Sequence, residues 1–151
     1  MDHQKRYRSS SLRLRDYDYA QAGTYFVTLC VHDRACLFGD VLDDTMHPSA
    51  SGDMLLHWWT ELSNKYPEVE VDAVIVMPNH LHGVILITDC GDAAETPRSG
   101  ASLGAIVGWF KTMTTNAYIR GVRASGWKPF SRRLWQSNYY EHIIQNELAH
   151  D

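Results

Sequence analysis

Two short apolar segments joined by a tight connection constrain the fold most. Residues 71–77, VDAVIVM, and residues 82–87, HGVILI, are almost uninterrupted runs of aliphatic side chains, and the tetrapeptide PNHL links them. Apolar runs of this length predict β-strands, and strands without polar alternation are usually central in a sheet and covered by helices. The sequence therefore predicts two neighbouring central strands.

Further strands and helices are predicted on both sides of this pair. The flanking pattern predicts a strand at 22–32, a hairpin or short edge strand within 36–49, a helix through Trp58 and Trp59 that Pro67 stops, and a helix at 102–121. The polar segment 88–102 is predicted to be a loop, and a short extended piece follows the second helix. This order predicts an α+β fold, a ferredoxin-like or RRM-like antiparallel sheet with helices packed on one face.

The length and composition predict one domain. A chain of 151 residues suits a single domain, 1–151, in which residues 1–16 form a basic N-terminal arm. No apolar run approaches the ~18 residues of a membrane span, and the polar N-terminus lacks the apolar core of a signal peptide. A cytoplasmic location is therefore expected. The three cysteines form no CxxC pair and are interpreted as structural.

Charge is segregated along the chain. The net charge is -4, yet residues 1–15 carry five Lys/Arg and residues 111–133 carry six with no acid, whereas residues 16–110 carry fourteen acids. Basic segments on an acidic protein indicate a local polyanion site, although two solvated basic faces would give the same pattern. The candidate DNA-binding residues are Arg6, Arg8, Arg13, Arg15, Lys111, Arg120, Arg123, Lys128, Arg132 and Arg133.

His80 and His82 form the candidate metal site. Side chains alternate along a strand, so the two imidazoles should share one face while Leu81 turns to the core. The pair could hold a divalent cation, or it could bond to backbone groups and water. Zinc prefers three or four protein ligands, and no CxxC or HxxxH partner is present. A two-histidine site with open positions suits Mg²⁺ or Mn²⁺, which take phosphate and water oxygens.

Several sequence blocks together resemble a known family. YDYAQAGTYFVTLC, CLFGDV, VDAVIVMPNHLHGVILI, SLGAIVGWFKT and LWQSNYYEHII, in this order, resemble the REP-associated branch of the single-tyrosine HUH transposases of insertion-sequence type. The match runs from about Tyr17 to Glu147. Five blocks in the right order are far more specific than the HxH tripeptide alone.

The resemblance implies a DNA strand transferase that acts on single-stranded DNA folded into hairpins. It implies that His80 and His82 hold the cation that polarises the scissile phosphate, and that a tyrosine attacks phosphorus. Attack would leave a 5′-phosphotyrosine and a free 3′-hydroxyl. The basic arm and loops would bind the hairpin and its flanking bases.

The sequence departs from the family pattern at the nucleophile. The family's tyrosine lies on a helix after the YYEHII block, which would fall beyond Asp151, so the C-terminal helix is expected to be incomplete and the chain a shortened copy or fragment. Tyr139 and Tyr140 are substitutes, although their position favours packing on the sheet. Asn79, Glu141 and His142 are candidates for supporting polar roles.

Two alternatives to an active transposase stay open. A non-catalytic module derived from such an enzyme would bind hairpin or single-stranded DNA without a metal. An RNA-binding sheet is a weaker alternative, because the chain lacks the aromatic RNP pattern. The expected partner is single-stranded or hairpin DNA, no membrane partner is expected, and the protein could be a monomer or a homodimer.

Overall fold

The computed structural model describes residues 22–88 and 101–144. Its elements, in chain order, are β1 (Gly23–Cys30), a short 3₁₀ turn η3 (His32–Arg34), β2 (Gly39–Leu42), β3 (Thr45–Pro48), α1 (Ala50–Lys65), β4 (Val69–Met77), β5 (His80–Ile87), α2 (Leu103–Ser125) and β6 (Tyr140–Ile144). The predicted strand, hairpin and helices are all present. The helix predicted to end near residue 121 continues to Ser125.

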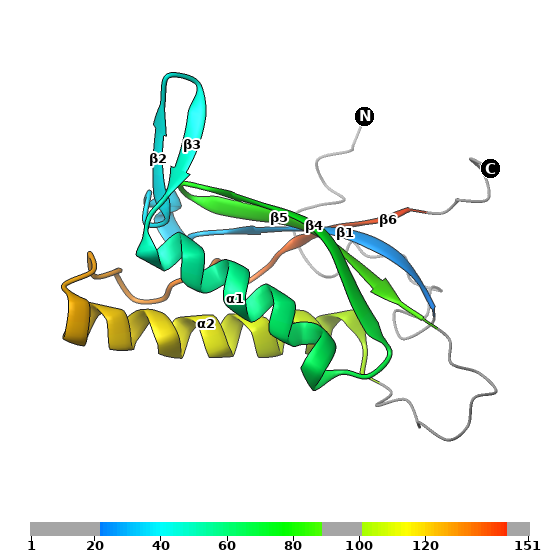
Figure 1. The fold of residues 1–151 in the computed structure, drawn as a ribbon. Coiled ribbons are helices and arrows are strands. Elements are labelled where there is room, and N and C mark those ends of the chain that lie inside the picture. Colours follow the sequence, from blue (N-terminus) through cyan, green and yellow to red (C-terminus); the bar gives the residue numbers. More distant parts are fainter. Residues whose placement is uncertain (1–21, 89–100, 145–151) are drawn as a thin grey trace.

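The main sheet has four antiparallel strands in the order β4-β5-β1-β6. Both helices pack on one face of this sheet, and the β2–β3 hairpin projects from one end (Figure 1). Without the hairpin, the chain order is β1-α1-β4-β5-α2-β6, which is the ferredoxin-like arrangement. The predicted α+β fold class is confirmed. The other face of the sheet carries no helix of the described residues and is called the open face below.

The prediction that both apolar strands are central is wrong for one of them. β5 lies inside the sheet, but β4 is an edge strand. Ile75, in the middle of the VDAVIVM run, is 55% exposed. The helices bury only the inner face of β4, and the register shifts between Val71 and Val74. The apolar run therefore predicted the strand correctly, but it did not predict that only one face of the strand is buried.

Local sequence explains where the elements begin and end. Asp43 and Asp44 have φ angles of 52° and 64°, as a two-residue hairpin turn of the primed type requires. Ser49 caps α1 by accepting a hydrogen bond from the Gly52 amide, and α1 ends before Pro67. Trp59 is almost fully buried, as expected for a helix that docks on the sheet through a tryptophan.

The core lies between the helices and the inner face of the sheet. Its largest fully buried side chains are Trp59, Tyr25, Tyr118, Phe38 and Phe110. Among the described residues, no helix is long and apolar enough to cross a membrane.

Some sequence predictions lie outside the described residues. These are the basic arm at 1–16 with Arg6, Arg8, Arg13 and Arg15, most of the loop predicted at 88–102 with Cys90, and the incomplete helix predicted beyond Ile144.

Candidate functional site

The histidine pair lies on the open face at the start of β5. His80 and His82 are half-buried, whereas Leu81 between them is completely buried. The register places His80 opposite Cys30 and His82 opposite Thr28 of β1. The predicted sharing of one face by the two imidazoles is confirmed.

The two rings converge through their Nε2 atoms. These atoms lie 3.1 Å apart, and the ring centroids lie 4.7 Å apart. The other ring nitrogen of each histidine, Nδ1, makes a hydrogen bond to a neighbouring side chain. Nδ1 of His80 lies 2.8 Å from Oδ1 of Asn79, and Nδ1 of His82 lies 2.9 Å from Oγ1 of Thr28. The supporting contact predicted for Asn79 is thus present.

The partners at Nδ1 determine what Nε2 can do. The Asn79 carbonyl oxygen can only accept, so His80 carries its proton on Nδ1 and presents a lone pair at Nε2. The Thr28 hydroxyl can donate or accept. When it donates, His82 bears its proton on Nε2 and donates to His80. When it accepts, both Nε2 lone pairs are free and point at a common position, which is the arrangement that a shared cation requires.

Burial and nearby charge keep His80 in the ligand form. Burial lowers the pKa of His80, and the neighbouring charges of His82 and Arg34 lower it further. A lowered pKa means that His80 is neutral at neutral pH, as a metal ligand must be. Burial raises the pKa of the Cys30 thiol on the adjacent strand, so this thiol stays protonated and is a poor ligand.

The donor set of the pair fits a divalent cation with open coordination positions. Within residues 22–88 and 101–144, no third His, Cys, Asp or Glu joins the pair in a cluster that could hold a metal. Two imidazoles therefore leave positions for oxygen ligands from phosphate or water, as a catalytic site does.

An aromatic ring adjoins the histidines on the open face. Phe26 of β1 stacks on His82 with the centroids 5.6 Å apart and an interplanar angle of 18°. Phe26 is 36% exposed, so it fixes the orientation of His82 and also presents a ring face to solvent. Aromatic faces of this kind stack on nucleobases of single strands.

The two candidate tyrosines lie on opposite sides of the sheet. Tyr140 of β6 pairs with Thr28, which in turn pairs with His82, so these residues form a row across three strands of the open face. At the usual spacing between strands, the Cα atoms of Tyr140 and His82 are about 10 Å apart. Tyr139 packs against the core, with Nζ of Lys111 5.6 Å from the centroid of its ring.

The same pairing separates the two other polar candidates near the C-terminal strand. His142 lies opposite Phe26 and shares the open face, whereas Glu141 lies opposite the buried Val27 and faces the other way.

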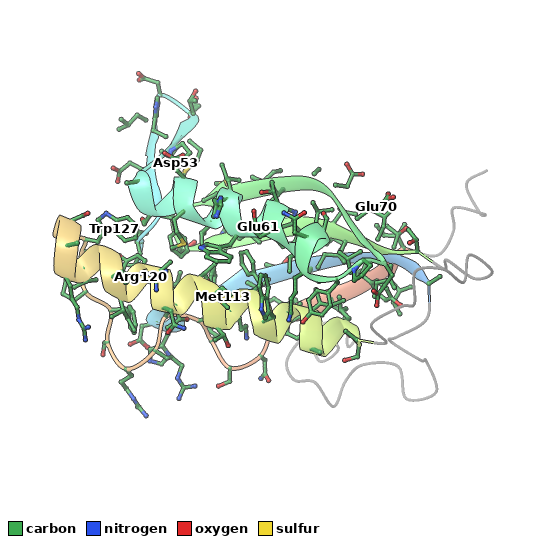
Figure 2. The ribbon with its side chains drawn as sticks, turned by 60° about the horizontal axis from the view of Figure 1, so that its bottom comes forward. Asp53, Glu61, Glu70, Met113, Arg120 and Trp127 are labelled. Atoms are coloured by element: carbon green, nitrogen blue, oxygen red, sulfur yellow. The ribbon has the colours of Figure 1, made fainter. Side chains whose placement is uncertain are left out.

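The described basic candidates cluster on α2 and the loop that follows it. Arg120 and Arg123 are exposed on α2, whereas Asp53 and Glu61 lie on α1 (Figure 2). α2 packs on the opposite face of the sheet from the histidines (Figure 1). The loop beyond residue 126 connects α2 to the edge strand β6. The described basic candidates are Lys111, Arg120, Arg123, Lys128, Arg132 and Arg133.

Arg34 is a basic residue near the histidines that the sequence pattern did not indicate. It is exposed in η3, where its φ of 53° and the 62° of Asp33 are unusual for residues other than glycine. The loop that carries it braces the turn before β5, because the amides of Leu37 and Phe38 both donate to the Pro78 carbonyl. Arg34 was missed because it lies in the acidic part of the chain, where only the fold brings it to the pair.

Removing the polar groups that contact the Nδ1 atoms of the two histidines should weaken metal binding, although both imidazole ligands remain. We expect Thr28→Val and Asn79→Ala each to lower Mn²⁺ affinity about 10- to 100-fold, because each frees one ring to rotate and change tautomer. Isothermal titration with Mn²⁺ measures the effect. Thr28→Ser should restore affinity, and Thr24→Val at the far end of β1 is the matched control. Unchanged affinity in both Thr28→Val and Asn79→Ala would contradict the proposed orientation of the rings.

Comparison with known proteins finds a sequence relative and structural neighbours that include two transposases. An uncharacterized protein of Haemophilus influenzae is 33% identical over 152 residues, which cover 93% of this chain and 81% of that protein. No protein-family model matches the chain. A REP-associated tyrosine transposase bound to a REP hairpin superposes with a TM-score of 0.54 and 21% identity, covering 91% of this chain and 66% of that one.

The second neighbour is a proposed transposase from Deinococcus radiodurans, with a TM-score of 0.50, 16% identity and coverage of 91% of this chain and 89% of that one. Both neighbours agree with the resemblance found in the sequence blocks. The chain therefore belongs to one protein family with the Haemophilus influenzae protein and has the fold of the REP-associated tyrosine transposases.

Proposed function

We propose that this protein binds single-stranded DNA folded into a hairpin, and cleaves and rejoins it through a tyrosine beside a divalent cation held by His80 and His82. One observation carries the proposal: the Nε2 atoms of the two histidines converge to 3.1 Å while both Nδ1 atoms are held by neighbouring polar groups. The structural neighbour that is bound to a REP hairpin supports hairpin DNA as the substrate class.

Four side chains on the open face have roles in this reaction. The cation, Mg²⁺ or Mn²⁺, polarises a phosphate oxygen when bound. His80 and His82 would hold it through Nε2, and Phe26, which stacks on His82, would stack on a base next to the cleaved bond. The tyrosine oxygen bonds to phosphorus, the bond to the 3′ oxygen breaks, and the proton of the tyrosine passes through water to that oxygen. Among the described residues, Tyr140 is the tyrosine on the same face as the pair.

Cleavage should produce a covalent adduct. We expect the protein, incubated with Mn²⁺ and a hairpin oligonucleotide that has single-stranded ends, to form a protein–DNA species that survives denaturing electrophoresis. Tyr140→Phe should abolish the adduct if Tyr140 is the nucleophile, because the attacking oxygen is removed. Tyr139→Phe is the matched control, since its ring packs against the core and Lys111.

The other outcomes of this experiment are equally informative. An adduct that persists in Tyr140→Phe would assign the attack to another tyrosine. Hairpin binding without an adduct in Mn²⁺ or Mg²⁺ would favour the non-catalytic DNA-binding module. No preference for a hairpin over a plain single strand would contradict both functions.

A further inference from the structure

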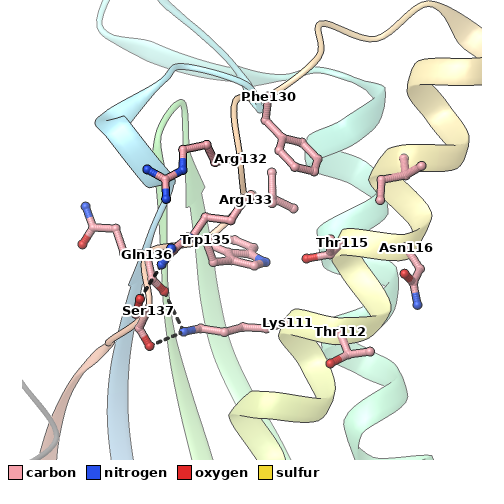
Figure 3. A pocket seen from close by; sticks show the side chains of 12 residues that line it. Lys111, Thr112, Thr115, Asn116, Phe130, Arg132, Arg133, Trp135, Gln136 and Ser137 are labelled. Atoms are coloured by element: carbon pink, nitrogen blue, oxygen red, sulfur yellow. Dashed lines mark hydrogen bonds between the residues drawn. The ribbon is translucent and has the colours of Figure 1, made fainter.

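A second candidate site lies away from the histidines, between α2 and the segment 130–137 (Figure 3). The pocket has a volume of about 500 Å³, within the range of small-ligand sites. Its outer wall is fixed to the sheet: the Gln136 amide donates to the Cys30 carbonyl at 2.9 Å, and the His32 amide donates to the Leu134 carbonyl at 2.9 Å. The Trp135 indole nitrogen donates to Thr114 of α2 at 3.0 Å, so the two walls are also tied to each other.

The charge of the pocket favours an anion. Lys111, Arg132 and Arg133 line it, and no carboxylate of residues 22–88 and 101–144 does. Lys111 donates to the carbonyls of Gln136 and Ser137 at 2.9 and 3.3 Å, and burial lowers its pKa to about 8. An anion in the pocket would stabilise the charged form of this lysine.

Arg132 differs from the other two cations of the pocket. Arg133 donates to the Ser137 hydroxyl, whereas among the described residues the Arg132 guanidinium has no hydrogen-bond or ion-pair partner. The φ of Arg132 is 70°, a left-handed conformation that is strained for a residue other than glycine. Strain of this kind is retained at functional positions more often than elsewhere.

The rest of the lining suits a sugar and a base. Phe130, Ile119 and Leu134 give the pocket an apolar side, and Thr112, Thr115 and Asn116 of α2 add hydroxyl and amide groups. A bare phosphate would not use the apolar side, and an apolar ligand would not use three cations. A nucleotide uses both.

We propose that this pocket binds one nucleotide unit, with its phosphate at Lys111, Arg132 and Arg133 and its base against the side formed by Phe130 and Ile119. The nucleotide could belong to a single DNA strand or be free in solution. The first source rests on the proposed function, and the segment that forms the outer wall leads directly to Tyr140 at the edge of the sheet.

The test measures binding of the full chain to a short oligothymidylate without a hairpin, by fluorescence anisotropy in EDTA so that the metal site makes no contribution. We expect Arg132→Gly to weaken binding about tenfold or more, because it removes one charge-assisted contact. Glycine keeps the left-handed backbone without strain, so this variant should fold. Asn116→Glu should weaken binding at least as much by placing a carboxylate in the pocket.

Two variants outside the pocket control for general attraction between charges. Lys65→Ala removes one charge on α1 and Ala124→Glu adds one on α2, both at exposed positions. Each should weaken binding less than about threefold, because neither touches the ligand. Equal losses in the pocket variants and these controls would overturn the proposal.

Competition with thymidine 5′-monophosphate separates the two sources. Displacement only at concentrations far above that of the oligonucleotide identifies the DNA strand, whereas displacement at equal concentrations identifies a free nucleotide. If neither the oligothymidylate nor thymidine 5′-monophosphate binds, the proposal of a nucleotide pocket is overturned. If the protein does not cleave the hairpin but Arg132→Gly still selectively weakens oligothymidylate binding, the proposed function is contradicted and the nucleotide pocket is supported.

Discussion

His80→Ala and His82→Ala are each expected to lower Mn²⁺ affinity by more than about 100-fold, beyond the effect expected when only the supporting groups are removed. Each substitution deletes one of two converging Nε2 ligands, and a single imidazole with water is a weak site for Mn²⁺. Isothermal titration of the purified chain measures the loss. Formation of the covalent adduct should disappear in parallel, because the same cation activates the phosphate.

A matched control and a stability measurement distinguish a metal site from a merely structural pair. His47→Ala removes an exposed histidine of β3 and should leave Mn²⁺ affinity unchanged. If the pair serves only to satisfy hydrogen bonds, His80→Ala and His82→Ala should lower the free energy of unfolding by about 1–3 kcal/mol while Mn²⁺ binds as weakly to the wild type as to the variants. That result would contradict the metal site.

Local patterns predicted the histidine face correctly, because alternation along a strand depends on the strand alone. The orientation of the rings depends on Thr28, which is 54 positions away in sequence. Only the pairing of β1 with β5 brings this hydroxyl behind His82, and no local pattern contains that register. The separation of Tyr140 from Tyr139 has the same origin, since it follows from the pairing of β6 with β1.

The charge pattern was informative in a different way. The acid-free segment at 111–133 predicted a local polyanion site, and its first part lies on the helix side of the sheet because α2 packs there. Arg34 illustrates the converse, because a lone cation among acids carries no signal until η3 lies beside the turn that precedes β5. Composition thus predicted a polyanion partner, whereas the path that a bound DNA strand would follow depends on tertiary contacts.

Gly83→Ala should destabilise the protein. A Cβ at Gly83 would lie 2.3 Å from Cζ2 of Trp59 and 2.5 Å from its Cη2, so α1 would have to move away from the strand that carries the histidines. Overpacking of this kind costs about 1–3 kcal/mol, and the fully buried, rigid indole cannot turn aside. Urea unfolding followed by tryptophan fluorescence measures the change. Gly108→Ala is the control: nothing lies within 4 Å of its added Cβ, and alanine should stabilise α2 by up to about 1 kcal/mol.

A double-mutant cycle with Trp59→Phe tests whether the indole is the cause. The smaller ring removes most of the atoms that would clash, and it also removes the indole Nε1, which is buried without a hydrogen-bond partner among the described residues. We therefore expect Gly83→Ala to cost at least about 1 kcal/mol less in the Trp59→Phe background than in the wild type. Additive costs would show that the strand, not the helix contact, requires glycine. A favourable coupling would show that the close approach of α1 to β5 sets the position of the strand from which His80 and His82 extend.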